Sequence, residues 1–585
     1  MDTFTPTPAS IPPPGVRYNL REVTTSPNHH ALNPLAFILR AAQIYPDKVA
    51  LIHADVEFPV RYTFAVWAQR IQNLAYALIK AGIKPGDRVG VISPNAWARH
   101  YHTRYISLPP LVFLYSQDAH HAVIAARGVI TPINTRLKPS EVAYIIEHSQ
   151  AKLLLVDHEC KHLVAGHNVP VIISNDTGRV GDPYEQFLTE GRQFSKEKGW
   201  PGLMPELDEN AAAVLCYTSG TTGRPKGVVT TLRGSYLAAI ANAAEGQMNA
   251  NSTYLWILPM FHAAGWTFPW SCSFSFATQI TLRTVNFTHI WKHFLHSGVT
   301  HYCAAPTVQI GIVNDPHAKK PPQVVTAIIA GAAPTAHLIG ELERTGINPV
   351  HVYGLTETYG PFTRNYPQPS WATISLDERA RLMARQGQAF ATAEDVRVVF
   401  PYPEGVEDGP LVDVPRDGKT VGEIVTRGNI VMKEYFRDSA ATKKAFAGGS
   451  FHTGDLAVMH PNGTVAILDR SKDIIISGGE ASQNASSLAI EQELSSHPHV
   501  LEVSVVARPH VKWGERPMAF VVLHPQHEGR WKGRHADFEA DLKNHAKSKL
   551  PGFACPEWVE IVPELPKTST GKILKLELRK IVAKL

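Results

Sequence analysis

Residues Tyr217–Gly227 read Tyr-Thr-Ser-Gly-Thr-Thr-Gly-Arg-Pro-Lys-Gly and follow an apolar run, Ala211–Cys216. Glycines allow positive φ, so several backbone N–H groups of such a loop can point at one spot. The Ser and Thr hydroxyls and the Lys226 ammonium add further donors. This combination indicates a loop that holds a polyphosphate. A polar surface loop between two strands is the alternative for so short a motif.

The residues around Lys226 decide between two kinds of phosphate loop. A kinase-type loop needs glycine before the lysine and Ser or Thr after it, whereas Lys226 lies between Pro225 and Gly227. The motif resembles instead the phosphate loop of the adenylate-forming enzymes, which include acyl-CoA synthetases, luciferases and peptide-synthetase adenylation domains. That resemblance implies that ATP is held by Thr218, Ser219, Gly220, Thr221, Thr222, Gly223 and Lys226.

Length and composition set wide bounds on the class of protein. A chain of 585 residues with 44% hydrophobic residues is long enough for roughly two to four globular domains. A net charge of +5 without a long Lys/Arg run does not favour nucleic-acid binding. The five cysteines form no CxxC pair, so neither a zinc site nor a disulfide framework is expected.

Two segments bear on targeting. Residues 1–34 lack the basic start and apolar core of a signal peptide and are expected to form a loosely ordered or disordered lead-in. Tyr254–Leu282 contains no Asp, Glu, Lys or Arg, but its prolines and His262 favour a buried, broken segment over a membrane-spanning helix.

Alternating helix and strand patterns predict an α/β fold, with mixed or parallel sheets layered with helices. A capped apolar stripe predicts a helix over Thr63–Ala81, and Arg88–Ile92 reads as the strand that follows. The same unit recurs further along the chain. The other elements are helix Ser140–His148 and strands Lys152–Val156, Ile257–Phe261, Gln279–Arg283, Thr326–Ala330 and Pro349–Tyr353.

A composition shift after Val465 predicts two domains. We expect a large domain over residues 35–468, a hinge at 469–472 and a small, mobile α+β domain over 473–585. Strands are predicted near Val500–Ala507 and Met518–Leu523, with helices near Ser487–Leu494 and His535–Leu550.

The segment Trp97–Gln117 has no steady period and precedes a predicted helix around His120–Arg127. It is interpreted as an insertion. The alternatives are a surface loop and an error of the gene model.

The other motifs of the adenylate-forming family follow the phosphate loop in the family's order. Val352–Thr358 reads Val-Tyr-Gly-Leu-Thr-Glu-Thr and combines an aromatic, hydroxyls and a carboxylate after a predicted strand. A strand exit with a solvated Glu is the alternative for this motif alone. The resemblance implies that Tyr353 and Gly354 pack on adenine, that Thr356 touches the α-phosphate, and that Glu357 binds Mg²⁺ together with Thr218. Gly331, Ala332 and Ala333 resemble the other wall of the adenine site.

Three further positions complete the nucleotide site by resemblance. Asp455, in Phe-His-Thr-Gly-Asp, would accept hydrogen bonds from the ribose hydroxyls, although a lone Asp there is more often a turn residue. Arg470 would contact ribose or phosphate, and Asp469 and Lys472 would form the hinge. Lys572, in Pro-Lys-Thr-Ser-Thr-Gly-Lys, would bridge the carboxylate and the phosphates as the acyl-adenylate forms.

The acyl and CoA sites are also assigned by resemblance. His262 and Trp266, with Ala304, would line the acyl pocket and its entrance, although a lone histidine is more often a core residue. The CoA channel would be formed by Ser477, Gly478, Gly479 and Glu480. Here the chain departs from the family, because Ala481–Gln483 intrude before Asn484.

The joint motifs imply an acid–CoA ligase that uses ATP, Mg²⁺ and coenzyme A. Leu237–Asn242, Thr300–Cys303 and Tyr359–Phe362 resemble fungal peroxisomal acyl-CoA ligases of the siderophore or toxin side-chain type. Ala583-Lys584-Leu585 resembles a peroxisomal signal, which implies an import receptor as partner. Two alternatives remain: an adenylating enzyme that loads a carrier protein, and an impaired ligase-like protein that binds acyl groups or nucleotides.

Overall fold

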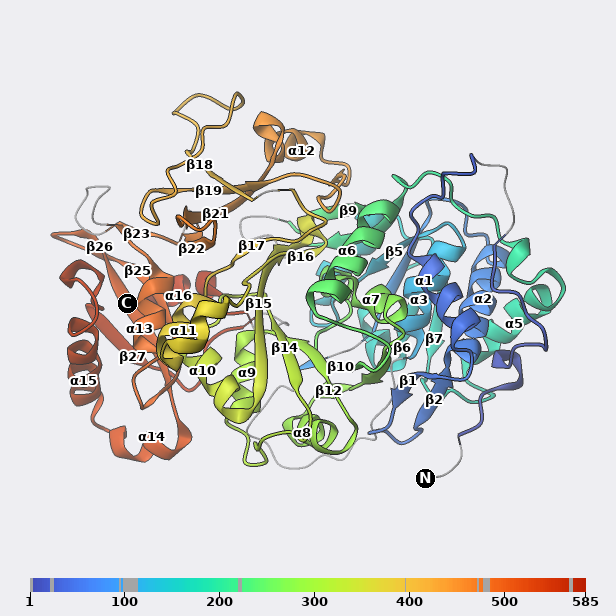
Figure 1. Ribbon diagram of the computed structural model, residues 1–585, viewed down its shortest axis with the longest axis horizontal. Coiled ribbons are helices and arrows are strands. Elements are labelled where there is room, and N and C mark those ends of the chain that lie inside the picture. Colours follow the sequence, from blue (N-terminus) through green and yellow to red (C-terminus); the bar gives the residue numbers. More distant parts are fainter. Residues whose placement is uncertain are drawn as a thin grey trace.

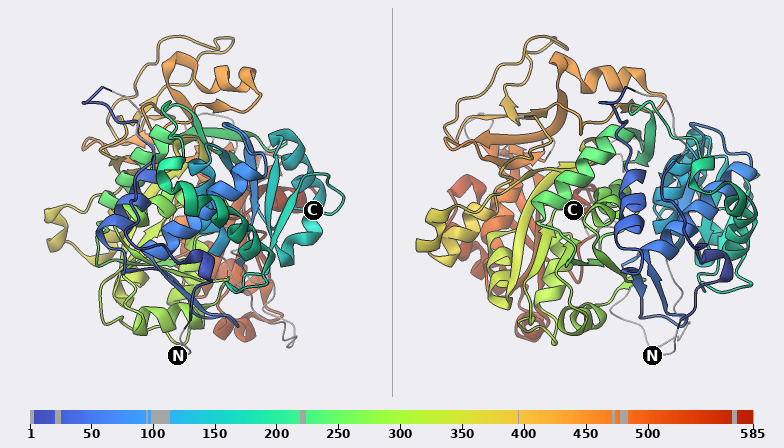
Figure 2. Two further views of the ribbon diagram at one scale, coloured as in Figure 1. Left: turned by 90° about the vertical axis from the view of Figure 1, so that its right-hand side faces the viewer. Right: turned by 45° about the vertical axis from the view of Figure 1, so that its right-hand side comes forward.

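The computed structural model describes residues 4–20, 26–93, 96–97, 114–218, 224–394, 396–470, 473–476, 484–567 and 572–584. The chain forms a large domain followed by a small one (Figure 1). The small domain lies at the end of the large domain that is remote from the first helices, as two further views also show (Figure 2). The predicted α/β architecture with a smaller C-terminal domain is confirmed.

The first sheet of the large domain carries the predicted phosphate loop. Its strand order is β20-β9-β8-β5-β3-β6-β7, and all pairs are parallel except those of β9 with β8 and with β20. Its strands are β3 (Arg88–Ile92), β5 (Val129–Pro132), β6 (Leu153–Asp157), β7 (Val171–Ser174), β8 (Ala212–Tyr217), β9 (Gly227–Thr231) and β20 (Glu434–Tyr435).

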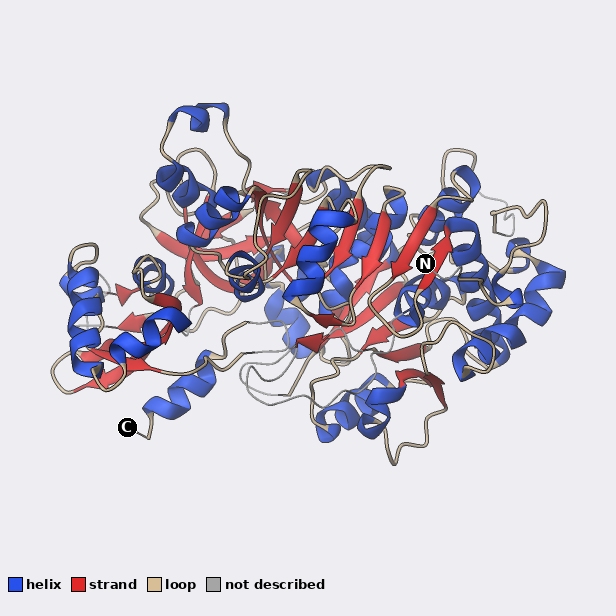
Figure 3. Ribbon diagram, turned by 90° about the horizontal axis from the view of Figure 1, so that it is seen from below, coloured by secondary structure: helices blue, strands red, loops and turns tan. Residues whose placement is uncertain are grey.

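The second sheet has the order β17-β16-β15-β14-β13-β10-β11-β1-β2 and is parallel from β1 to β15. Figure 3 shows the strands of the large domain in its middle with helices on either side. The strands are β1 (Val49–His53), β2 (Val60–Thr63), β10 (Thr253–Trp256), β11 (Thr278–Thr281), β13 (His301–Ala304), β14 (Val325–Ile329), β15 (Ile347–Leu355), β16 (Gly360–Arg364) and β17 (Gln388–Ala389).

Smaller sheets complete the chain. An antiparallel sheet links the domains, with strands β18 (Arg397–Val399), β19 (Val421–Thr426), β21 (Phe451–Met459) and β22 (Val465–Arg470). The small domain is built on β25 (Val500–His510), β26 (Gly514–Leu523) and β27 (Trp558–Ile561). Two short pairs are β4 (Ala96–Trp97) with β12 (Thr284–Val285), and β23 (Ile475–Ile476) with β24 (Asn484–Ala485).

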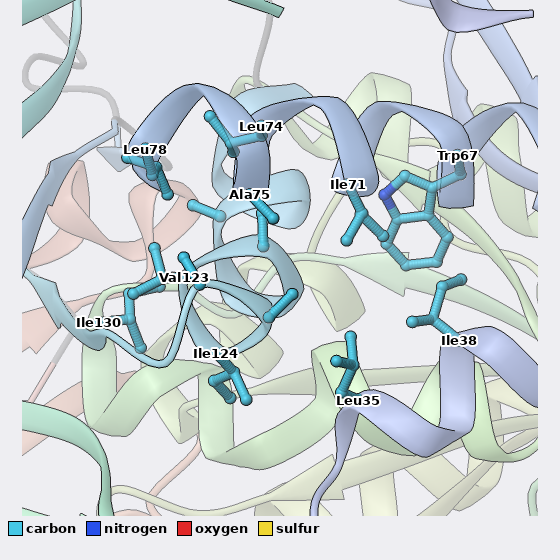
Figure 4. Packing of buried hydrophobic residues seen from close by; sticks show 14 of the residues in the cluster. Leu35, Ile38, Trp67, Ile71, Leu74, Ala75, Leu78, Val123, Ile124 and Ile130 are labelled. Atoms are coloured by element: carbon cyan, nitrogen blue, oxygen red, sulfur yellow. The ribbon is translucent and has the colours of Figure 1, made fainter. Parts of the chain in front are cut away.

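Helix α2 (Phe64–Lys80) organises the core of the first part of the large domain. Its N-cap Thr63 accepts a hydrogen bond from the Val66 amide, and its apolar stripe packs against α1 and α3 (Figure 4). The other helices are α1 (Leu35–Ile44), α3 (Leu114–Ala125), α4 (Pro139–Ser149), α5 (Pro183–Lys198), α6 (Leu232–Glu245), α7 (Phe268–Phe274), α8 (Phe287–His296), α9 (Pro306–Val313), α10 (Ala336–Thr345), α11 (Leu376–Met383), α12 (Ser439–Ala445), α13 (Ser487–Leu494), α14 (Pro525–Trp531), α15 (His535–Lys547) and α16 (Lys575–Val582).

Two local predictions differ from the structure. Ile257–Phe261 is a loop, because the strand of this region, β10, ends at Trp256 and Pro259 has no N–H to donate to a ladder. The end of the segment Trp97–Gln117 belongs to α3, where buried Tyr115 donates to the Ile92 carbonyl at 2.6 Å. Residues 98–113 of that segment lie outside the described residues.

The N-terminal lead-in and the uncharged segment Tyr254–Leu282 also have defined places. Residues 7–10 pack on the large domain in place of the loose lead-in expected from composition, and Ser10 accepts a hydrogen bond from buried Arg70 at 3.2 Å. Tyr254–Leu282 is divided among β10, α7 and β11. In the described part of the chain, every helix is too short or too polar to cross a membrane.

Buried histidines predict that acid destabilises the fold. Burial lowers the pKa of His53 and His121 to about 3 and that of His120 and His351 to about 4. Below about pH 6.5 the unfolded chain therefore binds protons that the folded chain does not. Each of these groups then removes about 1.4 kcal/mol of unfolding free energy per pH unit. We expect a markedly lower thermal midpoint at pH 5.5 than at pH 7.5.

Calorimetry at the two pH values measures this effect. The variant His351→Gln should show a smaller pH dependence, by up to one proton per molecule, whereas the exposed-residue control His317→Gln should keep the full dependence. A thermal midpoint that does not change between pH 7.5 and 5.5 would contradict the prediction.

Candidate functional site

The predicted phosphate loop is the turn of the β8–β9 hairpin. Tyr217 pairs with Gly227 across the hairpin, and the Thr218 amide donates to the Lys226 carbonyl at 3.0 Å. The ladder therefore fixes both ends of the loop. The predicted binding residues Ser219, Gly220, Thr221, Thr222 and Gly223 lie outside the described residues.

An aromatic cluster supports the base of this loop. Tyr144 on α4 donates to the Pro225 carbonyl at 3.3 Å, and its ring stacks on His148. His148 in turn lies 2.8 Å from the Tyr217 hydroxyl. The loop ends are thus held from the sheet and from a neighbouring helix.

Glu357, the predicted Mg²⁺ ligand, lies beside the same hairpin. It belongs to the 3₁₀ turn η5 (Thr356–Thr358) at the end of β15, together with half-buried Thr356. Its carboxylate accepts a hydrogen bond from the Tyr435 hydroxyl at 2.8 Å. The Lys226 ammonium lies 4.7 Å from the centroid of the same Tyr435 ring. The structure therefore brings Lys226 and Glu357, two predicted site residues that are 131 positions apart in the sequence, to one tyrosine.

Burial raises the pKa of Glu357, while hydrogen bonds to its carboxylate, including that from Tyr435, act in the opposite direction. A carboxylate and a hydroxyl oxygen, Glu357 and Thr218, are the oxygen donors that Mg²⁺ takes beside substrate phosphates and water. The Lys226 ammonium, over the ring of the tyrosine that hydrogen-bonds Glu357, suits a phosphate rather than a metal ion. The donor set therefore fits a magnesium ion that is bound together with ATP.

The predicted ribose and adenine residues come together where β15 meets the antiparallel β21–β22 ladder. Tyr353 on β15 donates to the Asp455 carboxylate at 2.6 Å, and Arg470 lies 3.3 Å from the other carboxylate oxygen. Asp455 and Arg470 are direct partners in the β21–β22 ladder. Gly331, Ala332 and Ala333 follow β14, which pairs with β15, so they lie on the same edge as Tyr353 and Gly354.

The charge of Lys572, in the small domain, affects the pKa of His262 in the large domain. Burial, and after it the positive charge of Lys572, lower the pKa of His262 to about 4. His262 is therefore neutral at physiological pH and can donate or accept one hydrogen bond without carrying charge. The predicted catalytic lysine is therefore close enough to the predicted acyl-entrance histidine for its charge to affect the pKa of that histidine.

The segment that follows His262 is strained. Within η4 (His262–Thr267) and its end, Ala263, Trp266 and Thr267 have φ values of 44°, 52° and 63°. Asn242 on α6 holds this backbone by donating to the Trp266 carbonyl at 2.9 Å and to the Thr267 hydroxyl at 3.0 Å. Left-handed backbone at non-glycine residues persists only where the surroundings fix it, and such strain concentrates at functional sites.

The acyl-pocket residues are only partly brought together. Trp266 is buried and packs on Gly360, where an added Cβ would lie 2.9 Å from the Trp266 Cβ. Ala304 belongs to a different hydrophobic cluster, on the other face of β13, whereas Cys303 shares the cluster of Trp266. Successive residues of a strand face opposite sides, and the sequence motif did not reveal which side faces the pocket.

Of the predicted hinge, residues 469–472, the structure describes Asp469 and Arg470. Asp469 is buried, and its carboxylate accepts hydrogen bonds from the Ser487 amide at 2.8 Å and the Ser487 hydroxyl at 2.5 Å, at the start of α13 in the small domain. The hinge residue Lys472, the CoA-channel residues Ser477, Gly478, Gly479 and Glu480, and the intruding Ala481–Gln483 lie outside the described residues.

Tyr435 and Asn242 were missed by sequence reasoning. Tyr435 stands in Met-Lys-Glu-Tyr-Phe, with no glycine or charge pattern that predicts a site. Its place next to Lys226 arises from the pairing of β20 with β9, which joins residues remote in sequence. Asn242 carries one weak signal, because it is a polar residue on a helix face that is otherwise small and apolar.

The chain matches two models of known protein families. A family model described as AMP-binding enzyme matches residues 38–100 and 118–436, and a model described as AMP-binding enzyme C-terminal domain matches residues 489–572. The gap between the first two ranges lies inside the segment interpreted as an insertion.

The chain is also similar to individual proteins over nearly its whole length. It is 38% identical over 579 residues to a peroxisomal acetate/butyrate–CoA ligase from Arabidopsis thaliana, covering 94% of this chain and 95% of that protein. It is 40% identical over 581 residues to an acetate–CoA ligase from Humulus lupulus, with 94% and 95% covered. The crystal structure of ATP-bound MatB from Rhodopseudomonas palustris matches with a TM-score of 0.75 and 25% identity, covering 94% of this chain and 99% of that chain. These relatives are plant and bacterial proteins, not the fungal siderophore or toxin ligases that three short segments had suggested.

Proposed function

We propose that one site between the two domains of this chain serves both half-reactions. The premise is that the chain belongs to the AMP-binding enzyme family and is an ATP-dependent acid–CoA ligase. The observation that supports the proposal is that the charge of Lys572, in the small domain, helps burial to lower the pKa of His262 in the large domain. This fits a catalytic lysine near the acyl entrance, as the first half-reaction requires.

In the first half-reaction, a carboxylate oxygen of the acid attacks the α-phosphorus of ATP, and pyrophosphate leaves. The transition state concentrates negative charge on the transferring phosphate, so cations aimed at it lower the barrier. Lys226 and the amides of the β8–β9 loop hold the β- and γ-phosphates. Lys572 bridges the attacking carboxylate and the α-phosphate, with Thr356 as a further donor.

The nucleoside is held by the residues at the strand ends. Tyr353 provides an aromatic face for adenine, with the Gly331–Ala333 segment opposite. The Asp455 carboxylate already accepts from Tyr353 and faces Arg470, and it provides the acceptor for the ribose hydroxyls. Glu357 and Thr218 would hold Mg²⁺, which would neutralise phosphate charge and orient the triphosphate.

In the second half-reaction, the CoA thiol attacks the acyl carbonyl of the acyl-adenylate, and AMP leaves. We propose that the small domain rotates at residues 469–472 between the steps, which withdraws Lys572 and brings the 477–480 segment to the CoA channel. One hinge thereby gives the same site two sets of groups.

The acid is proposed to be short-chain or aromatic. The compared plant ligases are named for acetate, butyrate, cinnamate and benzoate, and the large side chain of Trp266, which we propose lines the acyl pocket, is buried in the strained segment. A siderophore or toxin side-chain acid is the second candidate, carried only by the resemblance of Leu237–Asn242, Thr300–Cys303 and Tyr359–Phe362.

Pyrophosphate release from ATP over a panel of acids, with and without CoA, tests the proposal. We expect release with acetate, butyrate or benzoate, and thioester only when CoA is added. Release without any CoA consumption would indicate an enzyme that loads a carrier protein, and no acid-dependent release would indicate an impaired, binding-only protein.

Peroxisomal localisation is proposed on two grounds: several relatives are named peroxisomal, and the chain carries Ala583-Lys584-Leu585. A fluorescent protein fused to the N-terminus should enter peroxisomes, and the fusion that lacks the last three residues should stay outside. Equal distribution of the two fusions would refute a role for the tripeptide.

A further inference from the structure

We propose that Tyr435 is a positioning residue of the adenylation step: it holds the Lys226 ammonium on its ring face and the Glu357 carboxylate at its hydroxyl. The inference rests on the proposed function, in which Lys226 binds ATP phosphates and Glu357 binds Mg²⁺. Its evidence is the set of contacts that one tyrosine makes with two elements of the nucleotide site.

The hydroxyl end of Tyr435 fixes the carboxylate. The Tyr435 hydroxyl donates to Glu357 Oε1 at 2.8 Å. The backbone of the same segment holds the same residue, because the Met432 amide donates to the Glu357 carbonyl at 2.7 Å. A hydrogen bond to a charged group stabilises more than one between neutral groups. The segment 432–435 therefore sets both the main chain and the side chain of Glu357.

The ring face of Tyr435 fixes the ammonium. Lys226 Nζ lies 4.7 Å from the ring centroid, within the range in which a cation is attracted to an aromatic face. The main chain that carries this ring is held in place. β20 is fastened to β9 on both sides of Tyr435, where the Lys433 amide donates to the Val229 carbonyl at 2.8 Å and the Phe436 amide donates to the Gly227 carbonyl at 2.7 Å.

The tyrosine also separates two opposite charges. Lys226 and Glu357 would form an ion pair if they met, and each would then be partly neutralised before ATP arrived. In the described part of the chain, no ion pair joins them: the ammonium lies over the Tyr435 ring, and the carboxylate accepts from the Tyr435 hydroxyl. Tyr435 thus keeps the ammonium available for phosphate and the carboxylate available for metal, and it adds no charge of its own.

Two variants separate the two roles. In Tyr435→Phe the ring stays and the hydroxyl is lost. Calorimetric titration with ATP should then give a metal-free affinity within about twofold of the wild type, while the Mg²⁺ concentration that gives half of the metal-dependent gain in ATP affinity rises about tenfold. In Tyr435→Leu the ring is lost too, and metal-free ATP binding should also weaken about three- to tenfold.

Matched measurements exclude a merely structural role. Both variants should still convert purified acyl-adenylate and CoA into thioester at the wild-type rate, since no triphosphate takes part in that step. The control Tyr402→Phe removes a hydroxyl that donates to the Gly409 carbonyl at 2.8 Å, and it should change neither titration. The phenylalanine variant decides the question if the leucine variant does not fold.

Two results would overturn the inference: a Tyr435→Phe enzyme with an unchanged Mg²⁺ requirement, or an equal loss in both half-reactions. The titrations need no turnover, so they are informative even if the acid panel fails. A wild type that releases no pyrophosphate with any acid would refute the proposed function instead.

Discussion

Replacing Lys572 with alanine is expected to lower acid-dependent pyrophosphate release by about two to three orders of magnitude, because the charge that develops on the transferring phosphate loses a positioned cation. Thioester synthesis from added acyl-adenylate and CoA should continue, since Lys572 is withdrawn in that step. The charge of Lys572 contributes to the lowered pKa of His262, the residue proposed to line the acyl entrance. Pyrophosphate release and thioester formation are measured separately.

The nearby variant Lys580→Ala provides the control. Lys580 is exposed and pairs with Glu577 at 2.7 Å on the same helix, so both steps should keep their wild-type rates. If Lys572→Ala slowed both half-reactions to the same extent, the division of roles between the two domain positions would be wrong.

Replacing Asp455 with alanine is expected to slow both half-reactions by about a hundredfold or more, in contrast to Lys572→Ala. The AMP moiety is present in both steps, and the variant removes a charged acceptor of hydrogen bonds to ribose. It also leaves the Tyr353 hydroxyl and the Arg470 guanidinium without their present partner. Direct titration with AMP measures the loss without turnover.

An exposed carboxylate near the same antiparallel sheet serves for comparison. Asp413 pairs with Arg397 at 2.8 Å, and Asp413→Ala should leave AMP affinity unchanged. An Asp455→Ala enzyme that still bound AMP like the wild type would show that the ribose is held elsewhere.

The local signals of the sequence were sufficient for much of the fold. The cap at Thr63, the apolar stripe after it and the strand Arg88–Ile92 predict the observed α2 and β3 because capping and periodicity act over a few residues. The strand predicted over Ile257–Phe261 is wrong, because no local signal of this kind marks that segment. A short apolar run is compatible with a strand or with buried loop, and the tertiary packing around Pro259 decided it.

The site was predictable to the extent that motifs identified two residues that the structure brings together, Tyr353 in β15 and Asp455 in β21, whose roles stay predictions. It was not predictable where function depends on pairing between remote segments. The position of Tyr435 is set by the β20–β9 ladder, and the assignment of Ala304 depended on the phase of a strand. Neither the pairing of remote strands nor the phase of a strand can be read from a local sequence pattern.

Adjacent side chains at the end of β22 are bound to different domains: Asp469 accepts from Ser487 of the small domain, while Arg470 faces Asp455 of the large domain. Under the proposed mechanism, a rotation at residues 469–472 would have to break the pair of Asp469 with Ser487 or carry it along. We therefore expect an order of events. ATP and acid would react before this rotation, and CoA would become productive only after it, so that the thiol would reach the adenylate only once the adenylate had formed.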